Sequence, residues 1–184
     1  MSDTVTHDRL VRLLAERSAR RGEFTLASGR RSTLYVDARL TTMSPDGLTL
    51  VGPAGLQALD DAAWRVDAVG GLTLGADPVS YASALAGRPI RAFTVRKEAK
   101  QHGTGRLIEG PFREGDRVAV IEDVITTGGS ALRAVEAIRA AGGEVAGVLA
   151  LVDREEGGRE ALEDAGLRVL SLVRASEIVR AMEG

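Results

Sequence analysis

Residues 117–130, RVAVIEDVITTGGS, bring together side chains that could hold a phosphorylated sugar. An apolar run ends in two carboxylates, Glu122 and Asp123, which at a strand end can bind ribose hydroxyls or a hydrated Mg²⁺. The turn that follows contains three hydroxyl side chains and two glycines: Thr126, Thr127, Gly128, Gly129 and Ser130. Glycine lets backbone N–H groups converge on one anion, and the start of a helix adds partial positive charge. This order of strand, acids, turn and helix predicts a site for one phosphate group beside a sugar.

Two simpler explanations exist for this stretch. The acids could be solvated surface charges, and the turn could be an ordinary helix cap. The sequence also lacks the GxxxxGK[ST] pattern of nucleoside-triphosphate loops and the GxGxxG pattern of dinucleotide-binding folds. We favour the phosphate site because strand, acid pair, glycine turn and helix occur together in this order.

A second group of charges lies in VRKEAKQHG, residues 95–103. Four potential cations fall in this segment: Arg96, Lys97, Lys100 and His102. Such a cluster suits a polyanion such as pyrophosphate, or the negative charge that builds on a leaving group. Charge runs are more often solvated loops, and the segment alone leaves that alternative open.

Two further junctions are suited to a ligand. Residues 70–80, GGLTLGADPVS, form a glycine-bounded turn that could bring the backbone close to a ligand or could simply connect a strand to a helix. Residues 151–158, LVDREEGG, place Arg154 at a strand end, where its guanidinium could bind a carboxylate or pair with a neighbouring glutamate near the surface.

The elements that must position these residues alternate between strand and helix. Hydrophobic periodicity predicts strands after residue 66 and at 89–95, 117–123, 144–154 and 167–173, with helices at 5–18, 45–62, 80–87, 130–143 and 158–166. Residues 22–39 indicate two short strands around a Ser-Gly turn, and 96–110 a long loop. The alternation predicts a parallel sheet covered on both faces, which binds ligands beyond the carboxyl ends of its strands. The expected site therefore involves the junctions 70–76, 96–110, 122–130 and 153–157.

The length, composition and net charge of the chain restrict the classes of function that it can have. A chain of 184 residues with 44% apolar and 27% charged residues is typical of one globular domain. A net charge of −2 provides no bulk attraction to nucleic acid or membrane. The absence of cysteine excludes disulfides, thiolate nucleophiles and Cys-ligated zinc, and it fits a cytoplasmic location. The first 22 residues contain no apolar run long enough for a signal peptide or a membrane span.

Residues 118–130 resemble the 13-residue signature of type I phosphoribosyltransferases, which bind phosphoribosyl pyrophosphate. The resemblance implies an α/β fold in which helices flank a central, mainly parallel, twisted sheet. It also implies a single domain over residues 1–184, with a small N-terminal hood formed mainly by about residues 1–40 and a mobile loop at about 96–110. The loop of the signature would grip the 5′-phosphate and its acids would contact the ribose. Phosphoribosyl pyrophosphate would thus touch Glu122, Asp123, Val124, Ile125, Thr126, Thr127, Gly128, Gly129 and Ser130.

The basic segment resembles the mobile catalytic loop of orotate phosphoribosyltransferases. This likeness implies that Arg96, Lys97, Lys100 and His102 bind pyrophosphate, that Lys100 is catalytic, and that the loop reaches the neighbouring active site of a homodimer. It further implies that Thr126 and Arg154 contact orotate, that Leu72–Gly75 is a pyrophosphate loop, and that Mg²⁺ takes part through the substrate, with Glu122 or Asp123 contacting it through water. The expected reaction joins orotate to ribose 5-phosphate in pyrimidine synthesis, in the cytoplasm and without nucleic acid or membrane partners.

The hood departs from the pattern of this family. Ala27 stands where many members have a lysine, and Tyr35 is followed by Val36 instead of a second aromatic residue. Tyr35 is therefore either a contact to the base or a strand residue packed in the core, and His7, which has no partner motif, is expected at the surface. Two other functions remain open: a phosphoribosyltransferase for another base such as a purine, and a non-catalytic regulator that binds RNA or DNA.

Overall fold

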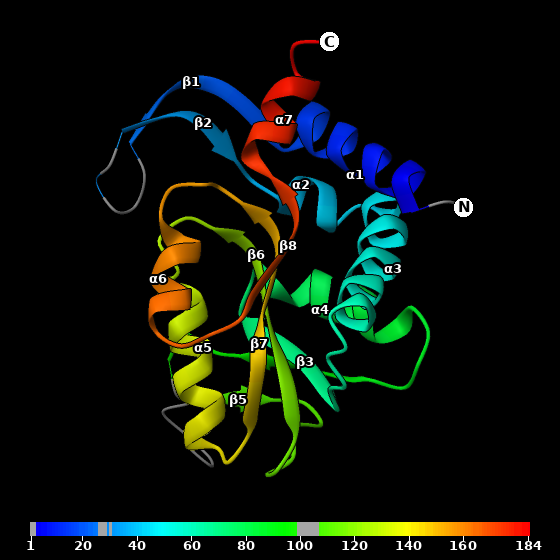
Figure 1. Cartoon of the computed structure of the whole chain (residues 1–184), viewed down its shortest axis with the longest axis vertical. Helices are drawn as coiled ribbons and strands as arrows, with labels where there is room; N and C mark the ends of the chain where they lie inside the picture. Colours follow the sequence, from blue (N-terminus) through cyan, green and yellow to red (C-terminus); the bar gives the residue numbers. More distant parts are fainter. Residues whose placement is uncertain (1–2, 26–28, 30, 99–106) are drawn as a thin grey trace.

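The computed structural model describes residues 3–25, 29, 31–98 and 107–184. Its centre is a six-stranded twisted sheet in the order β5-β4-β3-β6-β7-β8 (Figure 1). The strands are β3 (Ala68–Leu72), β4 (Arg91–Val95), β5 (Ile108–Glu109), β6 (Arg117–Ile125), β7 (Glu144–Asp153) and β8 (Val169–Arg174). Neighbouring strands are parallel except for the short edge strand β5, which runs antiparallel to β4. The expected α/β fold with a mainly parallel sheet is confirmed.

Helices cover both faces of this sheet (Figure 1). One face carries α1 (Asp3–Arg17), α3 (Pro45–Asp61), α4 (Ala76–Leu85) and α7 (Ala175–Ala181), and the other carries α5 (Gly129–Ala140) and α6 (Gly158–Asp164). Successive residues of one strand serve opposite faces: Ile121 packs in the cluster with α1 and α3, whereas Val120 packs with α5. This alternation explains why the central strands are continuous apolar runs.

A two-stranded hood lies beyond the carboxyl ends of the sheet (Figure 1). Its antiparallel strands are β1 (Ala19–Thr25) and β2 (Arg31–Val36), and the short helix α2 (Arg39–Thr42) follows. In β2 the side chains of Leu34 and Val36 are buried, whereas Tyr35 points to the opposite face. The hood thus places the residues 35–39 directly above the end of β6.

Several predicted elements differ from the structure. The sequence did not predict α7, which is only seven residues long and is stabilised by burial of Ala175 and Ile178 against the sheet. Residues 108–109, expected in a loop, form β5, because they pair with the exposed edge of β4. Val5, the first residue of the helix predicted at 5–18, lies inside α1, which begins at Asp3, and is 48% exposed. In the part of the chain that the structure describes, none of the helices is both long and apolar enough to cross a bilayer.

Candidate active site

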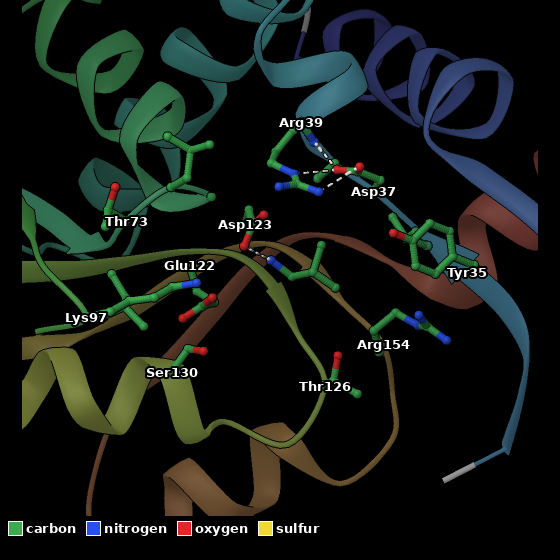
Figure 2. Close-up of a pocket in the computed structure, with 16 residues that line it drawn as sticks. Tyr35, Asp37, Arg39, Thr73, Lys97, Glu122, Asp123, Thr126, Ser130 and Arg154 are labelled. Atoms are coloured by element: carbon green, nitrogen blue, oxygen red, sulfur yellow. Dashed lines mark hydrogen bonds and ion pairs between the residues drawn. The ribbon is translucent and has the colours of Figure 1, made fainter. Parts of the chain in front are cut away.

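A cleft of about 290 Å³ opens between the carboxyl ends of the strands and the hood (Figure 2). Three of the four expected junctions contribute side chains directly, and the base of the 96–110 segment contributes Lys97. The lining consists of Tyr35, Val36, Asp37, Ala38, Arg39, Leu72, Thr73, Leu74, Gly75, Lys97, Glu122, Asp123, Val124, Thr126, Ser130 and Arg154. The cleft therefore lies where ligands bind in parallel α/β sheets.

The turn between β6 and α5 is built around Gly128. Its φ of +80° is a left-handed conformation that side chains rarely adopt, and a Cβ there would lie 3.0 Å from the Gly158 carbonyl oxygen and from Leu162. The turn is therefore held tightly against the start of α6, and α5 begins at the next residue. This geometry leaves the Thr126 and Ser130 side chains at the cleft. The N-terminus of the twelve-residue helix α5 follows the turn directly, as an anion site requires.

Not every residue of the signature presents its side chain to the cleft. Val124 lines it, but Ile125 is 1% exposed and packs in the core beneath α5. The carbonyl of Ile125 accepts the Arg154 backbone N–H at 3.0 Å. Thr127 is exposed and lies outside the cleft lining. Ile125 could therefore contact a ligand only through its backbone. Thr127 could do so through its backbone or through a side chain at the rim of the cleft.

The two acids share a dry environment at the end of β6. Glu122 is 7% exposed, and burial together with the neighbouring Asp123 carboxylate raises its pKa well above the usual value. Burial also raises the pKa of Asp123, although the Val124 N–H, which donates to Asp123 Oδ1 at 2.9 Å, acts in the opposite direction. Glu122 Oε2 is buried and has no hydrogen-bond partner among the described residues. Glu122 Oε2 is therefore a buried oxygen for which a hydroxyl group of a ligand could supply the missing hydrogen bond.

The turn between β3 and α4 forms the opposite wall. A Cβ at Gly75 would lie 2.2 Å from Asp123 Oδ2, so only glycine allows this backbone to approach the carboxylate so closely. The Thr73–Leu74 peptide bond in this turn is cis. The expected pyrophosphate loop, Leu72–Gly75, is therefore next to the expected ribose-binding acids.

An ion pair from the hood completes the wall above Asp123, and sequence reasoning missed it. Arg39 donates to both oxygens of Asp37, from Nε at 2.8 Å and from Nη2 at 2.9 Å (Figure 2). The pair lowers the pKa of Asp37 and raises that of Arg39. The positive charge of Arg39 also lowers the pKa of Asp123. The sequence feature that could have indicated this ion pair is the Asp-x-Arg spacing in VDAR, residues 36–39, directly after a hood strand.

Arg154 is buried beneath the hood. Its Nη2 donates to Ser32 Oγ at 2.8 Å and to the Leu34 carbonyl at 2.6 Å, and it pairs with Glu156 at 2.6 Å. The alternative of an Arg154–glutamate pair is thus realised, but in the interior, because Arg154 is only 5% exposed. Its buried Nε has no partner among the described residues, while the residue lines the cleft. Arg154 therefore belongs to the buried pair and also contributes to the wall of the cleft.

Tyr35 stands at the mouth of the cleft and is not a core residue. It is 40% exposed, lines the cleft and packs against the ring of Phe24 at a centroid distance of 5.4 Å. The core alternative for Tyr35 is therefore wrong, because the alternation in β2 turns its side chain away from Leu34 and Val36. Sequence reasoning did not include Phe24, which supplies the second aromatic ring of the hood.

The basic segment is described only at its ends. Arg96 donates to the Glu98 carbonyl at 3.2 Å and lies 3.8 Å from Glu109, outside the cleft lining. Lys97 lines the cleft. Lys100 and His102, like Ala27 in the hood, lie outside the described residues.

The C-terminal helix is linked to the loop that carries Arg154. The Ser176 backbone N–H donates to Glu155 Oε2 at 2.8 Å, and Glu177 Oε2 accepts the Arg174 N–H at 2.7 Å. The other carboxylate oxygen of Glu177 lies 2.9 Å from His7 Nε2. His7, expected as a plain surface residue, is therefore only partly exposed and joins α1 to α7.

Several known proteins are similar to the chain over nearly their whole length. No model of a protein family matches the chain. The orotate phosphoribosyltransferase of Aquifex aeolicus (strain VF5) is 48% identical over 179 residues, which cover 94% of this chain and 97% of that protein. The chain belongs to the orotate phosphoribosyltransferase family. It is accordingly a phosphoribosyltransferase enzyme.

Solved structures of this family agree with the fold. The orotate phosphoribosyltransferase of Mycobacterium tuberculosis H37Rv in complex with inorganic phosphate is 43% identical and superimposes with a TM-score of 0.83, covering 95% of this chain and 99% of that chain. The same enzyme in complex with phosphoribosyl pyrophosphate is 44% identical, with a TM-score of 0.80 and the same coverage. The fold is that of the type I phosphoribosyltransferases.

Proposed function

We propose that this protein transfers ribose 5-phosphate from phosphoribosyl pyrophosphate to orotate, releasing pyrophosphate and forming orotidine 5′-monophosphate in pyrimidine synthesis. Membership of the orotate phosphoribosyltransferase family supports the reaction. The observation that carries the proposal in this chain is one cleft that joins the glycine turn of α5, the acid pair of β6 and the buried Arg154. The turn would suit a phosphate, the acid pair a ribose, and Arg154 a base that carries a carboxylate.

The donor would lie along the β6–α5 side of the cleft. The turn at 126–130 and the N-terminus of α5 would bind the 5′-phosphate, since both present donors and positive potential. Glu122 and Asp123 would accept hydrogen bonds from the ribose hydroxyls, which supplies the partner that Glu122 Oε2 lacks. The pyrophosphate would then point toward the turn at 72–75 and toward Lys97.

Substitution at the anomeric carbon needs stabilisation of charge on the leaving pyrophosphate. As the bond loosens, negative charge grows on pyrophosphate and positive charge on the ribosyl centre, beside the carboxylates. Lys97 lines the cleft and would face the leaving group. By resemblance Arg96, Lys100 and His102 would join it, with Lys100 as the catalytic residue, when their segment closes over the cleft and excludes water.

The acceptor would lie under the hood. Arg154 would bind the orotate carboxylate through its guanidinium, because the residue lines the cleft beneath the hood. Thr126 lines the same part of the cleft, and Tyr35 offers its ring face at the entrance. Binding through Arg154 would distinguish orotate from uracil, which has no carboxylate.

Magnesium fits this donor set only together with the substrate. Among the described residues no group of three or more acids or histidines could hold a metal ion. Two carboxylates and the oxygens of phosphoribosyl pyrophosphate are nevertheless the hard ligands that Mg²⁺ prefers. Mg²⁺ bound in this way would neutralise pyrophosphate charge, with Glu122 or Asp123 contacting it through water. Chelation of divalent cations is expected to abolish turnover, and readdition of Mg²⁺ to restore it.

A second copy of the chain would cover the apolar surface beside the cleft. Several large hydrophobic side chains are exposed on α2, α4 and the turn between β3 and α4: Leu40, Met43, Leu74, Tyr81 and Leu85. Leu40, Met43 and Leu74 lie around one shallow hollow, Leu85 on α4 is 89% exposed, and large exposed apolar side chains favour self-association. We expect a homodimer by light scattering and a monomer for Leu85→Glu, with Val5→Glu, on the exposed side of α1, as the matched control. A wild-type monomer at assay concentration would reject this proposal.

The cytoplasmic location expected from the cysteine-free sequence stays a prediction.

The reaction is tested by supplying phosphoribosyl pyrophosphate and Mg²⁺ with orotate, uracil, adenine or hypoxanthine. Formation of orotidine 5′-monophosphate with orotate alone is the expected result. Turnover of a purine without turnover of orotate would reject the proposed acceptor while retaining the donor. Absence of turnover with every base, despite binding of the donor, would favour a regulatory role.

A further inference from the structure

One carboxylate in the first turn of α4 accepts two hydroxyl hydrogen bonds at once. Thr73 Oγ1 donates to Asp77 Oδ2 at 2.7 Å, and Thr94 Oγ1 donates to Asp77 Oδ1 at 2.8 Å. Thr73 belongs to the turn that lines the cleft, whereas Thr94 lies in β4. Asp77 therefore fastens the turn to the neighbouring strand.

A tyrosine extends this network toward the surface. Tyr81 OH lies 2.7 Å from Thr94 Oγ1. Because the single hydroxyl proton of Thr94 is directed at Asp77, the tyrosine must be the donor in this contact. Three hydroxyl groups thus support one carboxylate directly or in series, and hydrogen bonds to a charged acceptor are stronger than neutral ones.

The same point of the fold anchors the basic segment. The Thr73 backbone N–H donates to the Val95 carbonyl at 2.8 Å, and Arg96, the next residue, donates its N–H to the Leu107 carbonyl at 2.8 Å. The turn at 73–75 and the start of the segment that carries Lys97 therefore share one hydrogen-bonded junction. A shift of the turn would move both walls of the cleft that face the leaving group.

A general preference for acids at helix N-termini does not account for these contacts. An acid in the first turn gains a small stabilisation from the helix dipole whatever its partners are. Asp46, in the first turn of α3, is such a residue, and it pairs with Arg17 on the exposed surface at 2.8 Å. Asp77 instead places a negative charge beside an expected pyrophosphate site, where the charge alone would repel the ligand. Any favourable effect of Asp77 on binding must therefore come from the hydrogen bonds that hold the turn.

We infer that Asp77 is a positioning residue that holds the turn 73–75, through Thr73, in the conformation that receives the pyrophosphate end of the donor. The inference rests on the proposed function, because it assigns this turn to phosphoribosyl pyrophosphate. Asp77 itself does not touch the substrate, so its removal changes the binding of the donor and leaves the binding of orotate as it was.

The test compares Asp77→Asn with variants of its partner in β4. Asparagine has no charge and only one acceptor oxygen, so one threonine hydroxyl can no longer donate to residue 77, and KM for phosphoribosyl pyrophosphate rises about tenfold. KM for orotate stays within about twofold of wild type. Thr94→Val raises the same KM, whereas Thr94→Ser, which keeps the hydroxyl, restores the wild-type value. The double variant Asp77→Asn/Thr94→Val shows less than the sum of the two effects, because both break one network. Asp46→Asn is the matched control and changes neither KM.

Equal increases of both KM values, an unchanged KM for the donor, or no difference between Thr94→Val and Thr94→Ser would each overturn the inference. The dissociation constant of pyrophosphate, measured by calorimetry on the same variants, keeps the two proposals apart. If the wild-type protein forms no orotidine 5′-monophosphate, the proposed function fails, and the ratio of pyrophosphate affinities between variant and wild type still decides the role of Asp77. A wild-type protein that binds no pyrophosphate would overturn both.

Discussion

The close approach of Gly75 to Asp123 gives a sharp prediction for a single added methyl group. Gly75 has φ −66° and ψ −43°, so alanine fits its backbone without strain. The new Cβ, however, would lie 2.2 Å from Asp123 Oδ2 and 2.4 Å from Oδ1, whereas ordinary contact begins at 3.4 Å. The carboxylate must therefore retreat by about 1 Å.

This retreat has a cost that can be worked out from the contacts of Asp123. It breaks the hydrogen bond from the Val124 N–H, which at a charged acceptor is worth about 1.5–3 kcal/mol, or roughly tenfold or more in an equilibrium constant. A displacement of about 1 Å near the reacting atoms can lower a rate about 100-fold. We expect Gly75→Ala to lower kcat/KM for phosphoribosyl pyrophosphate by about 10- to 100-fold. The free energy of unfolding should fall by roughly 1–2 kcal/mol, because the gain of about 0.4–1 kcal/mol from replacing glycine offsets only part of the lost hydrogen bond.

Steady-state assays of Gly75→Ala at saturating orotate test this, with thermal unfolding measured in parallel. A double-mutant cycle isolates the cause: in the Asp123→Ala background, Gly75→Ala should have almost no further effect on the dissociation constant of the donor. Wild-type kcat/KM for Gly75→Ala, or an equal loss in both backgrounds, would refute the argument from steric contact with Asp123.

Two further predictions concern the buried charges of the cleft. Arg154→Lys keeps the charge but loses the planar fork, so KM for orotate should rise about tenfold or more, while KM for the donor stays within about threefold; a parallel rise of both values would mean that the hood had loosened instead. Burial raises the pKa of Glu122 above its usual value of 4.5, so the folded state binds protons more readily than the unfolded chain. Glu122 should therefore contribute a fall in the free energy of unfolding as pH rises from 4.5 through its raised pKa, and Glu122→Gln should make this fall smaller. Urea unfolding over a pH series measures it, and an identical pH dependence in wild type and variant would contradict the assignment.

Local patterns were sufficient to predict the architecture and one wall of the site. The buried strand β6, its terminal acids and the turn around Gly128 are contiguous in the sequence, so their order along the chain fixes their positions in space. Strand alternation with helices then placed Thr126 and Arg154 at the same edge of the sheet.

The remaining contacts join residues that are distant in the sequence, and no local pattern reveals them. Arg154 meets Ser32 and Leu34 only because the hood folds over the sheet. The exposure of Tyr35 depends on the register of β2 against the core, since one step along the strand would have buried it. The effect of Arg39 on Asp123 likewise needs the three-dimensional distance between the hood and β6.

The hydrogen bonds of α7 also have a consequence for how the protein is made. The loop that carries Arg154 is held by the Ser176 backbone through Glu155, and Glu177 reaches back to His7 near the start of the chain. The acid pair ends β6 and the glycine turn follows it directly, so both leave the ribosome before residues 175–181. The base-binding loop, however, gains this support only after α7 has emerged and docked. The capacity to bind donor phosphate should therefore arise during synthesis earlier than the capacity to bind the base.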